Sequence, residues 1–132
     1  MFELINIYED AATRMVELRN TQTGRVELCF DDSCLVCTEN FEFMEIGKKY
    51  DCKIRLFGNF EGSKKGKGKL CKIINDSVEI GGKPFIQVDV EANVYYIPKK
   101  KIQGSLEKNE FYFYFTRKDL VQVDDVINVG LI

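Results

Sequence analysis

The 132-residue chain contains no histidine, no tryptophan and only two prolines. Histidine is the side chain that most often acts as a general base near neutral pH. Its absence excludes Ser-His-Asp and Cys-His nucleophile activation, and it excludes every zinc site that needs an imidazole ligand. Since the chain has no other catalytic motif, we expect a protein that is not an enzyme.

Long apolar runs and basic residues near the amino terminus are lacking too. No apolar stretch approaches the roughly 18 residues that span a membrane as a helix. The first ten residues carry acidic side chains and no basic one, whereas a secretory signal begins with positive charge. We therefore expect a cytoplasmic protein without a membrane segment, whose five cysteines remain reduced thiols.

The cysteines are the obvious candidates for a metal site. Cys29, Cys34 and Cys37 follow a C-x4-C-x2-C spacing, with Cys52 and Cys71 further along the chain. Iron–sulfur proteins use such spacings, and four thiolates can also hold zinc. Cys34 and Cys37, however, stand among large and acidic residues, and Cys52 occupies an apolar position in a strand. Of a metal centre, a redox pair and structural thiols, we predict structural thiols with neither metal nor cofactor.

The clearest local pattern covers residues 46–58. From Tyr50 to Leu56, residues with apolar bodies alternate with charged ones, and Gly47 and Gly58 bracket this stretch. A period of two is typical of a strand with one buried and one solvated face. We predict that Tyr50, Cys52, Ile54 and Leu56 point inward, with a turn at Gly47 and a bend or bulge at Gly58.

About nine short strands with frequent turns are predicted, and no amphipathic helix of useful length. Residues 20–24 have the composition of a hairpin turn with Gly24 in a left-handed conformation, and Gly81-Gly82 form a second hairpin loop. In the strand over residues 25–30, we predict that Val26, Leu28 and Phe30 point inward. The chain is expected to be one domain, with amino-terminal strands and a loop over 1–46 and the main barrel over 47–132.

The predicted fold is all-β: a small antiparallel barrel or sandwich with an amino-terminal hairpin. In layout, residues 47–127 resemble an OB-type barrel, because a long strand bracketed by glycines is followed by a run of hairpins. The sequence departs from the OB pattern because no helix is predicted between the third and fourth strands of this region.

The net charge of −2 hides an uneven distribution. Residues 1–47 hold 3 basic and 10 acidic residues, residues 48–118 hold 16 and 8, and residues 119–132 hold only 3 acids. Such asymmetry is typical either of a basic binding region with acidic flanks or of segments that neutralise each other on folding.

Aromatic residues adjoin two basic segments: Tyr95-Tyr96 precede Lys99–Lys101, and residues 111–115 are followed by Arg117-Lys118. The Gly- and Lys-rich residues 61–69 match no phosphate-binding loop motif. Residues 110–115 contain five consecutive aromatics, of which Phe111, Phe113 and Phe115 are predicted to face the core. Aromatics beside basic side chains on a sheet are typical of proteins that bind single-stranded nucleic acid. The predicted contacts are Lys64, Lys65, Lys67, Lys69, Lys99, Lys100, Lys101, Tyr112 and Tyr114.

We therefore predict a small binding module for an anionic partner, either single-stranded nucleic acid or an acidic protein surface. The alternative is a protein-interaction domain of the inhibitor or immunity type. Its contact would be the acidic segment 27–45, with Asp31, Asp32, Glu39, Glu42 and Glu45. The remaining alternative is that each charged segment is only a solvated face, because charge runs are usually solvated.

Overall fold

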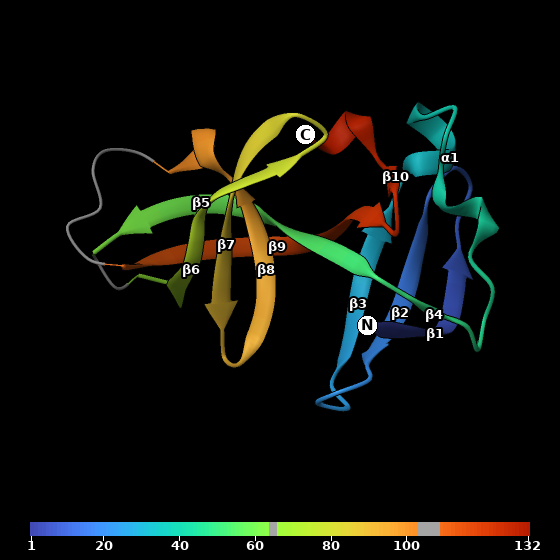
Figure 1. The fold of residues 1–132 in the computed structure, drawn as a ribbon, viewed down its shortest axis with the longest axis horizontal. Helices are drawn as coiled ribbons and strands as arrows, with labels where there is room; N and C mark the ends of the chain where they lie inside the picture. Colours follow the sequence, from blue (N-terminus) through green and yellow to red (C-terminus); the bar gives the residue numbers. More distant parts are fainter. Residues whose placement is uncertain (64–65, 103–108) are drawn as a thin grey trace. The chain divides into compact units, whose positions relative to one another are not determined.

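The computed structural model describes residues 1–63, 66–102 and 109–132. Most of the elements are strands (Figure 1). In chain order, the elements are β1 (Phe2–Glu9), β2 (Arg14–Asn20), β3 (Val26–Asp31), α1 (Ser33–Val36), η1 (Phe41–Phe43), β4 (Lys49–Tyr50), β5 (Cys52–Gly62), β6 (Lys69–Ile80), β7 (Lys83–Val90), β8 (Asn93–Pro98), η2 (Lys99–Lys101), β9 (Glu110–Val123), β10 (Val126–Ile127) and η3 (Val129–Leu131). The prediction of an all-β fold is confirmed.

The chain divides into two compact units. Residues 1–54 and 118–132 form the amino-terminal unit, and residues 55–117 form the barrel unit. The boundaries fall within β5 and β9, so each of these strands contributes residues to both units. Residues 47–54 and 118–132 thus belong with the amino-terminal strands and not with the barrel. That the whole chain is one domain stays a prediction.

The barrel is made by β5, β6, β7, β8 and β9. Their order is β9-β5-β8-β7-β6, and a further pairing of β6 with β9 closes the circle. The predicted barrel is confirmed, but it is mixed and not purely antiparallel, because β5 and β8 pair in parallel at Arg55 and Tyr96. The β7–β8 connection is a two-residue turn at Glu91 and Ala92, both with positive φ. The resemblance of residues 47–127 to an OB-type barrel stays a prediction.

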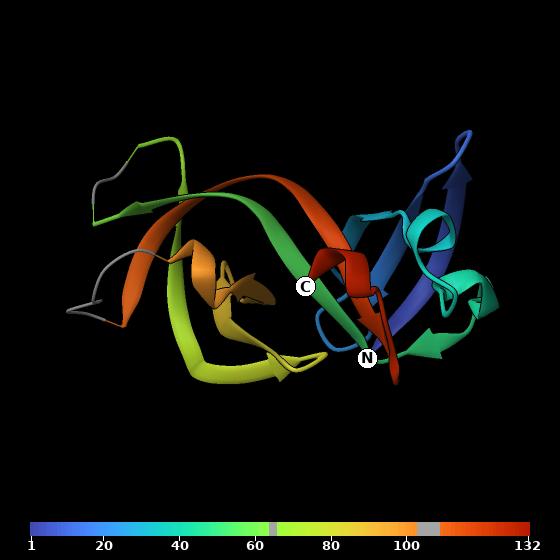
Figure 2. The ribbon, with the colours of Figure 1, turned by 90° about the horizontal axis from the view of Figure 1, so that it is seen from above.

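One barrel strand is longer than its sequence suggests. The polar residues 75–77 predict a turn between two strands, yet β6 continues through them to Ile80. Its register with β7 shifts between Ile73 and Asn75 and again before Val78, and the strand changes direction along its length (Figure 2). The Asn75 Oδ1 atom accepts a hydrogen bond from the Ser77 backbone amide at 2.9 Å, so a polar turn-forming side chain is satisfied within an irregular strand.

The barrel interior follows the predicted alternation of β5 and β9. Leu56, Phe111 and Phe113 are buried. At Gly58, β5 passes so close to β9 that a Cβ atom would lie 1.8 Å from the Tyr114 carbonyl oxygen. Only glycine fits there, which gives the predicted bend a steric cause.

In the amino-terminal unit, β1, β2 and β3 form an antiparallel sheet. The predicted turn between β2 and β3 is confirmed, with Gly24 at φ +76°. The Asn20 Oδ1 atom accepts a hydrogen bond from the Gln22 amide at 2.9 Å, and the Gly24 amide donates to the Asn20 carbonyl at 2.8 Å. Turn residues and backbone conformation agree here.

The prediction for the inward face of β3 is wrong. Val26 and Leu28 are 52% and 50% exposed, Phe30 is half-buried, and the inward positions belong to Glu27, Cys29 and Asp31. The apolar alternation predicted the opposite face of β3. Side chains alternate between the two faces of a strand, so an error of one residue inverts the orientation of every side chain. The buried carboxylates are stable there because each one meets a cation, as described below.

Candidate nucleic-acid interface

The aromatic strand β9 presents tyrosine outward as predicted. Phe111 and Phe113 are 1% and 0% exposed, whereas Tyr114 is 37% exposed and Tyr112 is half-buried. Phe115, expected in the core, is half-buried and lies in ring contact with Tyr95 at 6.4 Å. Alternation along β9 therefore places two tyrosine side chains on the outer wall of the barrel.

Tyr112 lies beside a hollow of about 470 Å³ in the barrel unit. It pairs across the strands with Leu70. Two lysines of β6, Lys69 and Lys72, and two carboxylates, Asp89 and Glu91, line the same hollow. A smaller hollow of about 230 Å³ also contacts Tyr112, from the side of Gly62 and Glu110. The structure thus brings together Lys69 and Tyr112 from the predicted set, and it adds Lys72, which the sequence pattern did not single out.

The other predicted lysines fall in different places. Lys64 and Lys65 lie outside the described residues, and Lys67 is exposed in the loop before β6. Lys99, Lys100 and Lys101 form the exposed 3-10 helix η2 directly after β8. There Pro98 pairs with Phe85 near the start of β7. Lys72, by contrast, pairs with Asp89 near its end. The ladder therefore separates η2 from the Tyr112 hollow by most of the length of β7.

A second aromatic site on the barrel was not predicted from the sequence. The Phe57 ring on β5 is 40% exposed. The Arg117 guanidinium lies 4.5 Å from its centroid, and that of Arg55 lies 5.4 Å from it. These distances are within the range of cation–π attraction. The signal was present, because the alternation that directs Leu56 inward also directs Phe57 outward.

The charge asymmetry of the sequence follows the two units. The barrel unit, residues 55–117, contains 12 basic and 7 acidic residues, whereas the amino-terminal unit contains 7 and 14. The described ion pairs also form within units. Lys69 pairs with Glu91 at 3.1 Å in the barrel, and Arg14 pairs with Asp31 at 2.6 Å in the amino-terminal unit. Tyr112, Tyr114 and Phe57 thus belong to a unit whose sequence carries a net charge of +5. A positive field attracts anions.

The acidic segment 27–45 is only partly a surface. Asp31 is 1% exposed and bound by Arg14, and Glu27 is 4% exposed with its carboxylate 3.1 Å from the Lys118 ammonium. Asp32 accepts a hydrogen bond from Asn128 Nδ2 at 2.7 Å. The prediction that Asp31 contributes to a contact face is therefore wrong, because its carboxylate is used inside the unit. Three carboxylates of the predicted face remain exposed: Glu39, Glu42 and Glu45.

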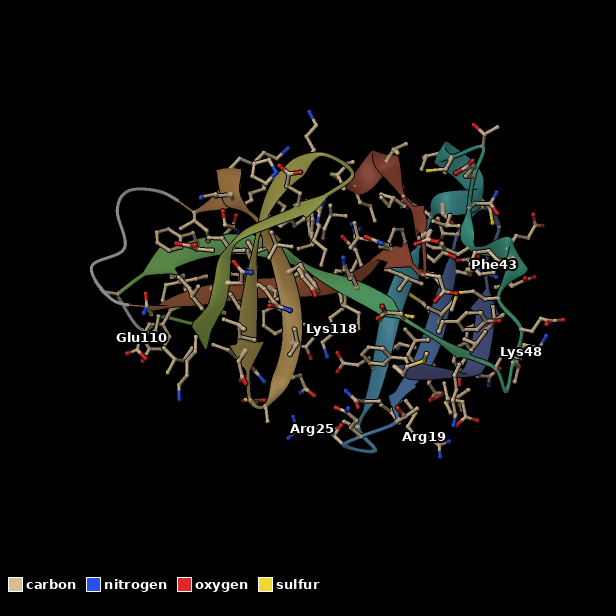
Figure 3. The ribbon with its side chains drawn as sticks, in the orientation of Figure 1. Arg19, Arg25, Phe43, Lys48, Glu110 and Lys118 are labelled. Carbon is tan, nitrogen blue, oxygen red and sulfur yellow. The ribbon has the colours of Figure 1, made fainter. Side chains whose placement is uncertain are left out.

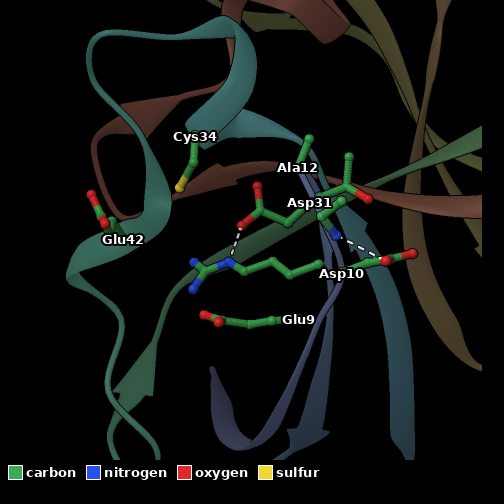
Figure 4. A pocket seen from close by; sticks show the side chains of 9 residues that line it. Glu9, Asp10, Ala12, Asp31, Cys34 and Glu42 are labelled. Atoms are coloured by element: carbon green, nitrogen blue, oxygen red, sulfur yellow. Dashed lines mark hydrogen bonds and ion pairs between the residues drawn. The ribbon is translucent and has the colours of Figure 1, made fainter.

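A hollow of about 200 Å³ in the amino-terminal unit joins these charges to a thiol (Figure 4). Cys34 projects from α1 toward the Arg14–Asp31 pair, and Glu9 and Glu42 line the rim. Partial burial raises the pKa of Cys34, an effect that Arg14 opposes and that Asp31 and Glu42 reinforce. The thiolate form of Cys34 is therefore disfavoured.

The remaining cysteines are free thiols. Burial is the main cause that raises the pKa of Cys29 well above its ordinary value, and the Glu27 carboxylate adds to it. Burial raises the pKa of Cys52 and of Cys71 to about 12. Cys37 donates to Asn128 Oδ1 at 3.2 Å. Among the described residues, no three ligand-type side chains come together as a metal site would require; the absence of bound metal stays a prediction.

No protein-family model, curated protein or solved structure was found that matches the chain significantly. Within residues 1–63, 66–102 and 109–132, no helix has the length and apolar character needed to cross a membrane. The function must therefore be argued from the residues themselves.

Proposed function

We propose that the protein is a cytoplasmic binding module that holds single-stranded nucleic acid on the outer wall of its barrel. The observation that supports this most directly is the hollow shared by Tyr112, Lys69 and Lys72. A tyrosine ring offers a face on which a base can stack, and lysine side chains beside it can contact the phosphates of the same strand of nucleic acid. Stacking is tolerant of sequence because every base has a π face.

The Phe57 site extends the same chemistry. Phe57 stands on β5, a neighbour of β9 in the barrel, and the Thr116 hydroxyl of β9 lies 3.4 Å from the Phe57 carbonyl oxygen. Guanidinium groups stack on bases and also contact phosphates. The outer wall of β5, β9 and β6 would therefore offer single-stranded nucleic acid three aromatic rings, those of Phe57, Tyr112 and Tyr114. Basic side chains accompany two of them, with arginines beside Phe57 and lysines beside Tyr112.

The test is fluorescence anisotropy with labelled single strands of DNA and RNA, about 20 nucleotides long, at low salt. Replacing Phe57 or Tyr114 with alanine removes an exposed ring without opening the core, and each change should weaken binding about fivefold or more. Phe43→Ala is the matched control, because Phe43 is 44% exposed but belongs to the amino-terminal unit.

Charge is tested separately. Lys72→Gln should weaken binding and reduce its salt dependence, whereas Lys48→Gln, an exposed lysine of the amino-terminal unit, should change neither. Absence of binding at low salt would overturn the proposal, as would equal losses in the barrel variants and their controls.

A protein contact through the acidic segment is the second candidate. Phe43 is 44% exposed in η1 and stands between the exposed Glu42 and Glu45, and an exposed aromatic ring among charges is typical of an interface anchor. If such a contact exists, a protein that co-purifies in equal amount should be lost from Phe43→Ala but retained by Phe57→Ala.

A further inference from the structure

The inverted strand β3 leaves an apolar stripe on the outside of the amino-terminal sheet. Val26 and Leu28 are half-exposed, while their neighbours Glu27 and Cys29 point into the core. Across the ladder, Val26 pairs with Arg19, and Leu28 pairs with Glu17. Figure 3 shows Arg19 near the turn that joins β2 and β3. We call these four side chains the outer face: Glu17, Arg19, Val26 and Leu28.

Exposure of Val26 and Leu28 costs free energy in an isolated molecule, because about half of each apolar side chain remains in contact with water. The strand could not turn them inward without also exposing Glu27 and Asp31. Both carboxylates are held by cations inside the unit, and breaking a buried pair costs more than apolar exposure. The fold therefore retains this face.

The charges of the outer face are arranged as a self-complementary set. One row across β1, β2 and β3 is Glu3, Arg19 and Val26, and the next row, about 7 Å further along the strands, is Asn6, Glu17 and Leu28. The Tyr8 hydroxyl donates to the Glu17 carboxylate at 3.3 Å, which leaves that carboxylate charged and able to accept from a second partner. A two-fold axis in the plane of contact, perpendicular to the strands and between the rows, exchanges the two rows. Arg19 of each copy then meets Glu17 of the other, and Val26 meets Leu28.

From this charge complementarity, we propose that the outer face binds a second copy of this chain in a two-fold, sheet-on-sheet contact. Such an isologous interface needs one patch that fits itself, which is what the two rows supply. The proposal is independent of nucleic-acid binding, which uses the barrel unit.

The dimer should be weak. Two strands and two rows of side chains cover roughly 10 Å by 15 Å, far less than the roughly 800 Å² that each partner buries in a standard interface. We expect a monomer at about 10 µM and a substantial dimer fraction near about 1 mM. Sedimentation equilibrium over this range of concentrations measures the association directly.

Charge exchange is the decisive experiment. Glu17→Arg alone places arginine against arginine, and Arg19→Glu alone places carboxylate against carboxylate, so each should weaken association about tenfold or more. The double variant E17R/R19E restores opposite charges and should regain most of the wild-type association. A merely structural role for either residue would not produce this rescue.

The apolar part is tested with Leu28→Lys, which should abolish the dimer at all concentrations. Ile74→Lys is the matched control, since Ile74 is 52% exposed on β6 of the barrel unit. Circular dichroism should show every variant folded. A wild-type protein that is monomeric at about 1 mM would overturn the proposal. A dimer that persists in Leu28→Lys, or that E17R/R19E does not restore, would also overturn it.

Discussion

The Lys69 ammonium lies 3.1 Å and 3.3 Å from the two carboxylate oxygens of Glu91. Lys69 begins β6, and Glu91 stands in the turn between β7 and β8 with φ +52°. Both residues line the hollow beside Tyr112. The carboxylate therefore screens one of the two lysines to which we assign phosphate contacts.

Neutralising Glu91 should strengthen nucleic-acid binding. In Glu91→Gln, the lysine keeps a polar neighbour of similar size but loses its counter-charge. We expect about a threefold rise in affinity at low salt and a steeper salt dependence, both measured by anisotropy. Glu79→Gln removes an exposed carboxylate elsewhere on β6 and serves as the control. Equal affinities for the two variants would contradict the assigned role of Lys69.

Removing one partner of the Arg14–Asp31 pair should strongly destabilise the amino-terminal unit. The Arg14 and Asp31 side chains are 10% and 0% exposed. Asp31 Oδ1 also accepts from the Ser33 amide at 2.9 Å. Asp31→Leu leaves a buried guanidinium without its carboxylate, so the free energy of unfolding should fall by about 3 kcal/mol or more in urea titrations.

The double variant Arg14→Met with Asp31→Leu tests the reason for that loss. If the uncompensated charge is the cause, the double variant should be more stable than Asp31→Leu alone. Glu45→Gln, which breaks the exposed Lys48–Glu45 pair, should leave the melting temperature unchanged, because surface pairs contribute little. Additive losses in the double variant would show that packing, not charge, dominates.

Two glycines should respond differently to substitution. Gly24 has φ +76°, and no heavy atom lies within 4 Å of the place that a Cβ atom would occupy, so Gly24→Val should cost about 1 kcal/mol of backbone strain. Gly58 lacks space, since its Cβ would meet the Tyr114 carbonyl oxygen. Gly58→Ala should therefore destabilise more than Gly24→Ala in thermal unfolding. The reverse order would contradict the close approach of β5 to β9.

Alkaline pH should destabilise the fold through its buried thiols. Burial raises the pKa of Cys52 and Cys71 from 9.0 to about 12. The folded state therefore favours the protonated thiol. This stabilisation is complete below about pH 9 and is lost as the pH rises toward 12, by up to about 1.4 kcal/mol per pH unit for each thiol. Urea unfolding from about pH 8 to about pH 11 should show a shallower decline for Cys52→Ala with Cys71→Ala than for wild type.

Val88→Ala provides the control for that experiment, because it removes apolar volume from the buried Val88 position without removing a titrating group. It should lower the stability at every pH while keeping the wild-type slope. A cysteine variant with the wild-type slope would mean that the thiols do not ionise on unfolding in this range.

The alternation of apolar and polar residues correctly predicted which side chains are buried in the strands that have one clear apolar face. Tyr50, Cys52, Ile54 and Leu56 are all buried as expected, and the tyrosines of β9 point outward. The turns at Gly24 and Gly81-Gly82 were also predictable, because positive φ strongly favours glycine. Closure of the barrel by a β6–β9 pairing had no local signal, since it joins residues some 40 positions apart.

The orientation of β3 could not be predicted for a related reason. Its face depends on Lys118, which lies 91 residues beyond Glu27, and on Arg14 across the ladder from Asp31. A hydrophobic pattern assigns charge to the surface and cannot recognise a buried pair whose partners are distant. The alternation along β5 was enough to predict that Phe57 points outward. The three consecutive lysines at Lys99–Lys101, however, are a stronger signal in the sequence than one aromatic residue near an arginine.

The order in which the chain is synthesised gives the two units different opportunities to fold. Residues 55–117 are consecutive, so the barrel unit can close as soon as β9 emerges from the ribosome. The amino-terminal unit also needs Leu120, Val121 and Val123, which are fully buried. Its β1–β3 sheet must therefore wait, with part of its core uncovered, while the barrel is being made. Nascent chains in which residues 118–132 have not yet left the ribosome should then expose an apolar sheet to chaperones, whereas the released 132-residue chain should not.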